Sequence, residues 1–189
     1  DPFLQFESWL EKAKEKEPIP TAMSLSTVSN NGEPALRTVL LKLFDKNGFV
    51  FFTNYKSKKA DHIAENRNVA ALFNWVALDR QVSINGVAEK IESKESIKYF
   101  MSRPRGSQLG AWVSDQNSVL SSRKIMEMKL EEMKRKFSNR EIPLPDCWGG
   151  YIIKPKTFEF WQGRPNRLHD RFRYFKQGND SWIIDRIAP

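Results

Sequence analysis

The chain has 189 residues, of which 40% are hydrophobic, and a formal net charge of +8. This length and composition are typical of one globular domain with a hydrophobic core. The excess of basic residues favours an anionic partner, which could be nucleic acid, an acidic surface or a phosphorylated small molecule. The single cysteine, Cys147, excludes an intrachain disulfide, and with only two histidines we expect no Cys/His metal site.

No stretch of the sequence is apolar over enough residues to cross a bilayer, and the first residues, DPFLQFESWL, do not resemble a signal peptide. A single cysteine also suits a reducing compartment. We therefore expect a cytoplasmic protein that forms one domain over residues 1–189 and does not bind a membrane.

The first part of the chain is predicted to form one helix and then strands. Apolar residues at helical spacing predict a helix over Pro2–Lys16. Alternating apolar residues predict a strand over Met23–Ser29, which ends at an Asn-Asn-Gly turn signal. Ala35–Phe44 and Phe49–Thr53 are predicted to form a hairpin, because Asn and Gly in the turn between them tolerate the positive φ angles needed there.

Helices and strands mix in the middle of the chain. Ser57–Asn66 is predicted to be a helix, whereas Val69–Val76 and Arg80–Ile91 are rich in apolar and β-branched residues, which favours strands. Ser93 can cap a further helix that runs to about Arg103, where a proline ends it.

The last part of the chain returns to strands after one more helix. Ser121–Phe137 has an apolar stripe at helical spacing, and its many Lys and Glu residues are predicted to form a solvated face. The predicted strands that follow are Gly149–Trp161, Arg167–Tyr174 and Trp182–Arg186. Runs of strands joined by hairpins favour an antiparallel barrel with helices packed outside.

Several nucleotide-binding and hydrolytic motifs are missing from the sequence. It has no G-x-G-x-x-G and no G-x-x-x-x-G-K-[ST], so neither a Rossmann nor a P-loop site is predicted. His169 and Asp170 look like two members of a catalytic triad. As neighbours on a strand they would point to opposite faces, which disfavours nucleophilic hydrolysis.

Basic residues are crowded near the C-terminus, in FWQGRPNRLHDRF. If Arg167–Tyr174 is a strand, Arg167, His169, Arg171 and Arg173 share one face. Such a row repels itself unless an anion or a carboxylate neutralises it. An exposed basic edge that discourages aggregation is the alternative.

Three further clusters could hold phosphate. They are Arg37–Lys42, Asn54–Lys59, and the set Tyr99, Arg103 and Ser107. A helix start with a hydroxyl and two ammonium groups, or a phenol with a guanidinium, suits a phosphate group. Each cluster also has a plain alternative, which is side chains extending into solvent, a basic helix start or an ordinary helix face. Strict alternation would place Arg37 and Lys42 on opposite faces, so one ligand could reach both only at a bulge or around the strand edge.

The identity of the anions comes from a resemblance. RTVLLK, FFTN, SKK, RQV, YFMSRPRGSQLGAWVS, WGGY and FEFWQG…NRLHDR follow one another from Arg37 to Arg171. Together they resemble the pyridoxine (pyridoxamine) 5′-phosphate oxidase family over nearly the whole chain. The resemblance implies an FMN-binding split β-barrel, antiparallel and Greek-key-like, with peripheral helices. It also implies a homodimer whose dimerisation and substrate-binding region spans about residues 147–189.

The resemblance also implies the site residues. Those expected to contact FMN are Arg37, Thr38, Val39, Leu40, Leu41, Lys42, Phe52, Thr53, Lys58, Lys59, Gln81, Gln116, Asn117, Trp161 and Arg171. Those expected to contact the substrate are Lys42, Tyr99, Arg103, Ser107, Arg167, Leu168 and His169. Arg167 and His169 would be the catalytic pair over the substrate ring. We interpret them as positioning and charge-stabilising groups rather than obligatory acid–base catalysts.

The implied reaction is oxidation of pyridoxine 5′-phosphate and pyridoxamine 5′-phosphate to pyridoxal 5′-phosphate. A hydride passes to FMN, and O2 reoxidises the flavin to give H2O2. The two FMN sites would lie at the subunit interface of the homodimer. Lys58 stands where many relatives have Arg, Phe52 where Tyr is frequent, and Asn117 where Ser is frequent, which leaves these individual contacts in question.

Two other classes of function stay open from the residues. A nucleic-acid-binding protein would explain the basic charge, but Trp9, Trp75 and Trp182 lie in apolar patterns typical of a core, and no RNP-type motif occurs. The other class is a related split-barrel flavoprotein, either a reductase or a cofactor-binding module without oxidase activity.

Overall fold

The structure, a computed structural model, describes residues 1–114, 116, 118, 120–178 and 181–189. Backbone contacts divide it into two compact units. Unit 1 comprises Asp1–Phe51, His62–Glu89 and Ile152–Pro189, and unit 2 comprises Phe52–Asp61 and Lys90–Tyr151. Most strand residues belong to unit 1, and three of the helices belong wholly to unit 2.

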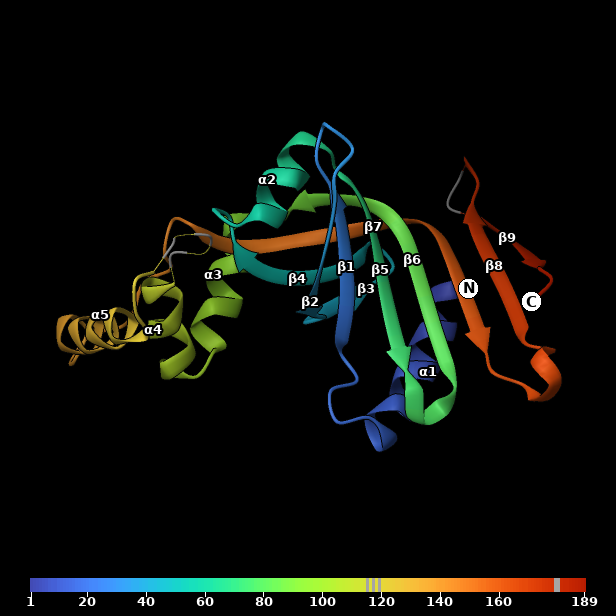
Figure 1. The fold of residues 1–189 in the computed structure, drawn as a ribbon, viewed down its shortest axis with the longest axis horizontal. Helices are drawn as coiled ribbons and strands as arrows, with labels where there is room; N and C mark the ends of the chain where they lie inside the picture. The colour runs from blue at the N-terminus through green and yellow to red at the C-terminus, as the bar shows by residue number, and fades with distance from the viewer. Residues whose placement is uncertain (115, 117, 119, 179–180) are drawn as a thin grey trace. The chain divides into compact units, whose positions relative to one another are not determined.

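The strands form one sheet (Figure 1). All the strand pairs for which the structure describes the residue-to-residue pairing are antiparallel. The strand order is β2-β1-β5-β6-β7-β4-β3, with β8 paired to β7 and β9 paired to β8. The strands are β1 (Ala22–Val28), β2 (Pro34–Leu40), β3 (Leu43–Asp45), β4 (Gly48–Asn54), β5 (Asn68–Trp75), β6 (Arg80–Lys90), β7 (Trp148–Gln162), β8 (Asp170–Lys176) and β9 (Trp182–Arg186).

The helices are short apart from the first and the last. They are α1 (Pro2–Lys16), α2 (Lys58–Glu65), α3 (Ser93–Ser102), α4 (Arg105–Val113) and α5 (Arg123–Lys136), with 3-10 turns η1 (Val76–Leu78) and η2 (Pro165–Arg167). None of the helices in the described part of the chain is long and apolar enough to cross a membrane. The prediction for α1 is confirmed at both ends. The Asp1 side chain accepts a hydrogen bond from the Phe3 amide, and Pro2 occupies the first helical position.

The sheet of unit 1 closes on itself because β2 and β3, the two ends of the strand order, are joined by only two residues. The amide of Leu41 donates to the Thr21 carbonyl at 2.8 Å, and the amide of Lys42 donates to the Val50 carbonyl, also at 2.8 Å. The chain therefore changes its pairing partner from β1 to β4 at this point. The prediction of an antiparallel barrel with helices is confirmed, but that of one strand over Ala35–Phe44 is wrong, because the partner change interrupts it.

Aromatic side chains fill the core of unit 1. Phe6 of α1 is fully buried, and its ring centroid lies 4.8 Å from that of Phe49, 4.9 Å from Phe73 and 5.1 Å from Phe44. Helix α1 therefore packs its apolar face on the inner surface of the sheet, where it excludes water from β3, β4 and β5.

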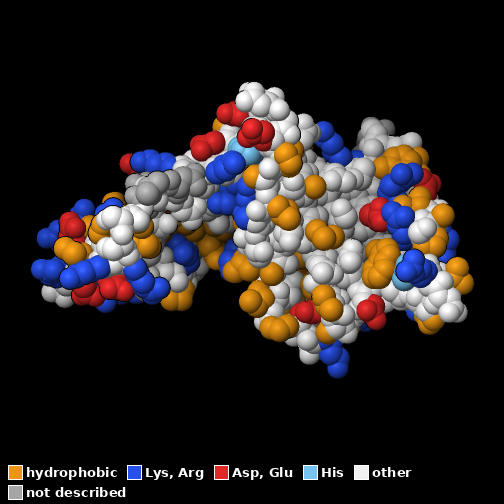
Figure 2. All heavy atoms as spheres, in the orientation of Figure 1, with side chains coloured by type: hydrophobic (Ala, Val, Ile, Leu, Met, Phe, Trp, Pro, Cys, Tyr) orange, Lys and Arg blue, Asp and Glu red, His pale blue; other side chains and the backbone are white. Residues whose placement is uncertain are grey.

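Unit 2 has a smaller core of its own. Its buried members are Phe100, Leu109, Ala111, Phe137, Ile142 and Trp148. Leu130 and Met133 of α5 pack against this core, whereas Lys and Glu side chains are mixed over the exposed face of α5 (left in Figure 2). The predicted apolar stripe and solvated face of this helix are confirmed for these residues.

Two local predictions in unit 2 are wrong. Glu92, not Ser93, occupies the N-cap of α3, and Ser93 is the first helical residue. Pro104 does end α3, but a second helix, α4, starts at Arg105 and was not predicted. The fixed φ of proline suits a residue at a helix start, so the same Pro104 ends one helix and leads into the next.

The predicted strand over Arg167–Tyr174 begins too early. Strand β8 starts at Asp170, and Arg167 lies in the 3-10 turn η2 with a φ of 62°. Asn166 before it also has a positive φ, of 59°. Two successive left-handed residues cannot continue a strand, so Arg167 and His169 do not share a strand face with Arg171 and Arg173.

The aromatic core of unit 1 predicts the effect of truncating Phe6. Phe6→Ala should lower the free energy of unfolding by about 3–5 kcal/mol, because it leaves a cavity among three other rings. Leu4→Ala on the same helix is the matched control, since Leu4 is 65% exposed and its truncation should cost within about 0.5 kcal/mol. Urea unfolding of the purified protein measures both. Equal destabilisation by the two substitutions would contradict this account of the core.

Candidate functional site

The predicted site residues divide between the two units. Unit 1 holds Arg37, Thr38, Val39 and Leu40 in β2, Leu41 and Lys42 between β2 and β3, Gln81 in β6, Trp161 in β7, Arg167 in η2, Leu168 and His169 after it, and Arg171 in β8. Unit 2 holds Phe52 and Thr53 in β4, Lys58 and Lys59 at the start of α2, Tyr99 in α3, Arg103 after it, Ser107 in α4, and Gln116. Asn117 lies outside the described residues.

Lys59 makes hydrogen bonds to two other residues of unit 2 that are predicted to contact FMN, Thr53 and Gln116, and to Ser57. Its Nζ donates to Thr53 Oγ1 at 3.0 Å, to Ser57 Oγ at 3.1 Å and to Gln116 Oε1 at 3.3 Å. The Ser57 carbonyl accepts hydrogen bonds from the Ala60 and Asp61 amides, so Ser57 stands at the start of α2. A fixed ammonium group beside hydroxyls at a helix start suits an anion.

Aromatic rings surround Arg103, and the sequence analysis listed two of them, Phe52 and Tyr99, as site residues. Its guanidinium carbon lies 4.7 Å from the ring centroid of Trp148, and the Tyr99 ring stacks on Phe52 with centroids 4.0 Å apart. Trp148 was missed as a site residue, although it opens the WGGY motif. Burial lowers the pKa of Arg103. Burial also raises the pKa of Tyr99, an effect that the nearby Arg103 charge partly opposes.

One guanidinium nitrogen of Arg103 is left without an acceptor. Within the part of the chain that the structure describes, Nη1 of Arg103 is buried and has no hydrogen-bond partner. A buried donor without an acceptor costs about 1–3 kcal/mol. An anion bound at this nitrogen would remove that cost, so the Tyr99–Arg103 pair fits a phosphate group.

In unit 1, Arg37 points to the inner face of the sheet. Its Nη1 donates to the Thr27 hydroxyl at 2.8 Å and to the Leu25 carbonyl at 3.0 Å. Thr27 Oγ1 also lies 3.3 Å from Nδ1 of the buried His62. Burial lowers the pKa of Arg37. Sequence analysis missed Thr27 and His62, and a polar residue at an inward-facing strand position was the only signal for Thr27.

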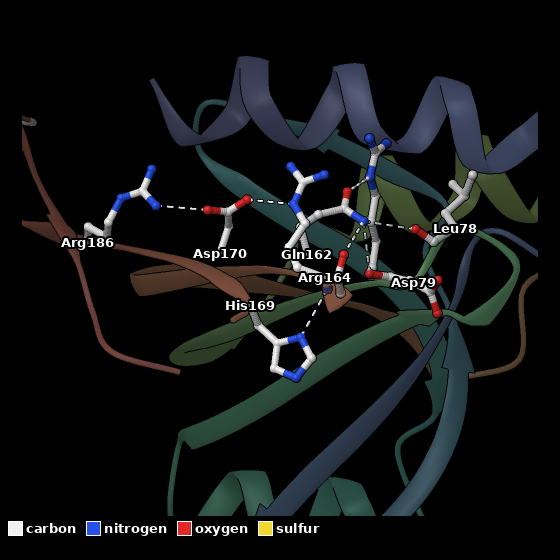
Figure 3. Close-up of polar contacts among 9 residues, drawn as sticks. Leu78, Asp79, Gln162, Arg164, His169, Asp170 and Arg186 are labelled. Atoms are coloured by element: carbon white, nitrogen blue, oxygen red, sulfur yellow. Dashed lines mark hydrogen bonds and ion pairs between the residues drawn. The ribbon is translucent and has the colours of Figure 1, made fainter. Parts of the chain in front are cut away.

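Gln162 ties the β7–β8 connection to the β5–β6 turn (Figure 3). Its Oε1 accepts from Nε of Arg80 at 2.7 Å, and its Nε2 donates to the carbonyls of Leu78 at 3.2 Å and Asp79 at 3.3 Å. The Gly163 amide donates to the Asp79 carbonyl at 2.7 Å. Arg80 directly precedes Gln81 in the sequence. Its Nη1 is buried and has no hydrogen-bond partner among the described residues. The segment that precedes Arg167 and His169 is thus fixed to the strand that carries Gln81.

The tautomer of His169 follows from one backbone hydrogen bond. The Arg164 amide donates to Nδ1 of His169 at 3.1 Å, so Nδ1 is an acceptor (Figure 3). A neutral imidazole then carries its proton on Nε2 and offers that N–H as a donor. The His169 ring also lies 4.7 Å from the Trp161 ring, which brings these two predicted site residues together.

Carboxylates neutralise the arginines of the C-terminal region. Asp170 pairs with Arg164 and with Arg186, each at 2.8 Å (Figure 3). Arg171 pairs with Glu159 at 2.8 Å and also donates to the Ala188 carbonyl, and Arg173 pairs with Asp185 at 3.1 Å. The prediction that an anion or a carboxylate must neutralise these cations is confirmed for Arg171 and Arg173, whose partners are carboxylates. The part of Arg171 in FMN binding stays a prediction.

Comparison with known proteins identifies the family. Residues 10–137 match the family described as pyridoxamine 5′-phosphate oxidase, and residues 148–189 match the pyridoxine 5′-phosphate oxidase C-terminal dimerisation region. The chain belongs to this family. A pyridoxine/pyridoxamine 5′-phosphate oxidase of Rippkaea orientalis is 62% identical, and the match covers all of this chain and 90% of that protein. One of Aliarcobacter butzleri is 57% identical with the same coverage.

Solved structures show the same fold. A crystal structure of PhzG from Burkholderia lata, in complex with tetrahydrophenazine-1-carboxylic acid, has a TM-score of 0.94 and 27% identity, over 100% of this chain and 93% of that chain. A pyridoxamine 5′-phosphate oxidase-related, FMN binding protein from Nostoc punctiforme has a TM-score of 0.81 and 19% identity, over 100% of this chain and 98% of that chain. The second likeness is one of fold alone.

The ion pairs of Asp170 predict a pH-dependent contribution to stability. Hydrogen bonds from Arg164, and then from Arg186, hold the pKa of Asp170 below its usual value. The contribution is present above the unfolded-state pKa of about 3.9 and is lost as the pH falls towards the lower folded-state pKa. Asp170→Asn should therefore lower Tm near neutral pH, and the difference from wild type should shrink between about pH 5 and pH 3.

Thermal unfolding followed by circular dichroism across this pH range measures the difference. Glu127→Gln is the matched control, because Glu127 and its partner Arg123 are 64% and 91% exposed and such pairs contribute little at any pH. A Tm difference between wild type and Asp170→Asn that is the same at every pH would refute the assignment.

Proposed function

We propose that the protein is an FMN-dependent oxidase that converts pyridoxine 5′-phosphate and pyridoxamine 5′-phosphate to pyridoxal 5′-phosphate. The observation that carries the proposal is the buried Nη1 of Arg103, which has no acceptor among the residues that the structure describes. Arg103 is the residue that the family pattern assigns to the substrate phosphate. Relatives that bear this enzyme name are up to 62% identical over the whole chain, which supports the same activity.

The residues of each unit fit parts of FMN. In unit 2 the Lys59 cluster offers an ammonium group and hydroxyls that suit a phosphate group, and in unit 1 the half-buried guanidinium of Arg37 offers a further cation. Gln81, on β6 next to the fixed Arg80, offers an amide that can donate and accept hydrogen bonds at the polar edge of a flavin ring. When bound, FMN would supply the redox chemistry, taking a hydride from the 4′ carbon of the substrate and passing the electrons to O2 to form H2O2.

The substrate phosphate would be held by Tyr99, Arg103 and Ser107, together with Lys42. Arg103 contributes an unused N–H and a positive charge, and the stacked rings of Phe52, Tyr99 and Trp148 restrict how its side chain can move. Orientation of this kind is the protein's main contribution when a cofactor carries the chemical step.

His169 would donate a hydrogen bond to the substrate rather than accept its proton. With Nδ1 occupied by the Arg164 amide, the neutral ring has its proton on Nε2 and no free acceptor nitrogen. The proton that leaves the substrate hydroxyl or amine must then pass to water or to another group. Arg167 lies in the turn η2, two residues before His169, and would contribute positive charge at the substrate. This supports a positioning role for both residues.

The assembly is also part of the proposal. We propose a cytoplasmic homodimer in which each chain forms one FMN-binding domain, with the FMN sites at the subunit interface. The match of residues 148–189 to a dimerisation region supports the dimer. An interface site would allow each chain to supply some residues to its partner's cofactor.

Three tryptophan rings of the kind that stacks on nucleic-acid bases are instead packed against other side chains of this chain. Trp75 is 1% exposed, the Trp9 ring carries the Arg80 guanidinium at 4.5 Å, and Trp182 packs edge-on against Phe158. The basic charge is therefore better explained by phosphorylated small molecules. PhzG, whose structure holds tetrahydrophenazine-1-carboxylic acid, is 27% identical to this chain, far below the 62% identity of a curated oxidase.

A spectrum and an anaerobic titration test the function. The purified protein should bind FMN and absorb in the visible, and pyridoxine 5′-phosphate should bleach this absorbance in the absence of air, because the substrate reduces the flavin. Unphosphorylated pyridoxine is the control and should bleach it far more slowly. A protein that binds FMN but is not bleached by either phosphorylated substrate would be a binding module or a different flavoenzyme.

Truncating Arg103 tests the substrate site. Arg103→Ala should raise KM for pyridoxine 5′-phosphate about 30- to 150-fold, equivalent to losing roughly 2–3 kcal/mol of charge-assisted contact. FMN affinity should stay within about twofold, since Arg103 is assigned to the substrate alone. Lys98→Ala is the matched control, because Lys98 is an exposed cation on α3, the helix that ends just before Arg103. Steady-state kinetics measure both, and an unchanged KM in Arg103→Ala would remove Arg103 from the site.

A further inference from the structure

Thr27 and His62 lie behind Arg37 and belong to none of the predicted contacts. Leu25 and Thr27 are buried, inward-facing residues of β1, and Arg37 is the cross-strand partner of Leu25. Cross-strand partners point to the same face of a sheet. Arg37 is therefore an inward-facing arginine on β2, the strand at one end of the strand order, and its guanidinium folds back over β1.

Three elements meet at the Thr27 hydroxyl. Nη1 of Arg37, on β2, donates to Oγ1 at 2.8 Å, and Nδ1 of His62, on α2, lies 3.3 Å from the same oxygen. Thr27 is 0% exposed and His62 is 5% exposed, so water does not compete for these contacts. The Leu25 carbonyl accepts a second hydrogen bond from Nη1 of Arg37 at 3.0 Å.

The donor and acceptor types of this group give the direction of donation. A guanidinium has only donors, so Thr27 Oγ1 accepts from Arg37. In the His62 tautomer whose Nδ1 carries no proton, the hydroxyl proton of Thr27 donates to that nitrogen. His62 thus turns the Thr27 lone pairs towards Arg37. The chain of donation runs from Arg37 through Thr27 to His62.

This arrangement leaves part of the guanidinium for an external ligand. Both contacts of Arg37 to Thr27 and Leu25 use Nη1, and among the described residues the other two nitrogens have no hydrogen-bond partner, so they remain for an anion. A guanidinium that is already held in place loses less rotational freedom when it binds, and this raises affinity. Second-layer hydrogen bonds of this kind orient the groups that touch the ligand.

We propose that Thr27, itself oriented by His62, is a positioning residue that holds Arg37 for the phosphate of the flavin cofactor. The proposal rests on the proposed function, because it requires that Arg37 contacts FMN. It assigns a role to two buried residues that contact neither cofactor nor substrate.

The test compares FMN with riboflavin, which lacks the phosphate. Thr27→Val keeps the shape of the side chain and removes the hydroxyl, and it should weaken FMN binding by about three- to tenfold while leaving riboflavin binding unchanged. Thr27→Ser keeps the hydroxyl and should bind FMN within about twofold of wild type. Fluorescence titration of the flavin-free protein measures both affinities, and Tm of the same samples reports any loss of stability.

Two substitutions of His62 provide a second test, which can be used if Thr27→Val does not fold. His62→Asn places an amide oxygen near the position of Nδ1 and should retain the FMN affinity, whereas His62→Leu removes the acceptor and should lower it about two- to fivefold, again without affecting riboflavin.

The outcomes separate this proposal from the proposed function. Wild-type FMN affinity in Thr27→Val, or equal weakening of FMN and riboflavin, would overturn the positioning role while leaving the oxidase function intact. If Thr27→Val does not fold, unchanged FMN affinity in His62→Leu would have the same meaning. A wild-type protein that binds no FMN at all would overturn both proposals.

Discussion

A buried guanidinium group must find an acceptor for each of its N–H groups, and this requirement shapes the polar chemistry of the protein. Arg37 meets it at Nη1 with a carbonyl and a hydroxyl, and Arg171 meets it at Nε and Nη1 with Glu159 and a carbonyl. Arg103 does not meet it, because Nη1 has no partner among the described residues. A partly buried guanidinium N–H without an acceptor destabilises the folded protein, because that group has lost its hydrogen bond to water. That destabilisation is what a bound phosphate would relieve, and it links packing to the proposed function.

The same requirement explains why the arginines near the C-terminus do not behave alike. Arg171 and Arg173 lie on β8 and have carboxylate partners on the neighbouring strands, Glu159 and Asp185. Arg167 lies outside the strand in a turn of left-handed residues and is exposed. Backbone strain of this kind is often found where a side chain must point at a ligand. The basic sequence thus contains structural arginines, which stabilise the β7–β8–β9 hairpins, and one that the fold presents outwards.

Gln162 and Asp170 show how the fold fixes the segment between them. Gln162 holds its start to the β5–β6 turn, and Asp170 holds its end to Arg164 and Arg186. Between these anchors, the Arg164 amide selects the tautomer of His169. A loop that is fixed at both ends keeps its functional groups in place at little entropic cost on binding. The proposed oxidase would therefore rely on orientation rather than on a strong base.

Local sequence signals predicted much of the fold. The bounds of α1 and β9 agree with the structure, because an N-cap with a following proline and a short apolar run between polar turns are local signals. The ordered motifs also identified the family. They placed Tyr99, Arg103 and Ser107 in one cluster, and in the structure Tyr99 and Arg103 lie close enough for their charges to interact, while the function of the cluster stays a prediction. Each of these inferences depends on residues that are close together in the chain.

The tertiary structure decided the rest. The sequence by itself determined a basic, mainly antiparallel β protein of the oxidase family, with its phosphate-competent clusters. Only the folded chain shows that the pairing partner changes at Leu41 and Lys42, that carboxylates neutralise Arg171 and Arg173, and that Thr27 and His62 stand behind Arg37. These features join residues 8 to 35 positions apart, and they depend on which strand lies alongside. No local pattern encodes such pairings, because the hydrogen bonds form only when distant strands come together.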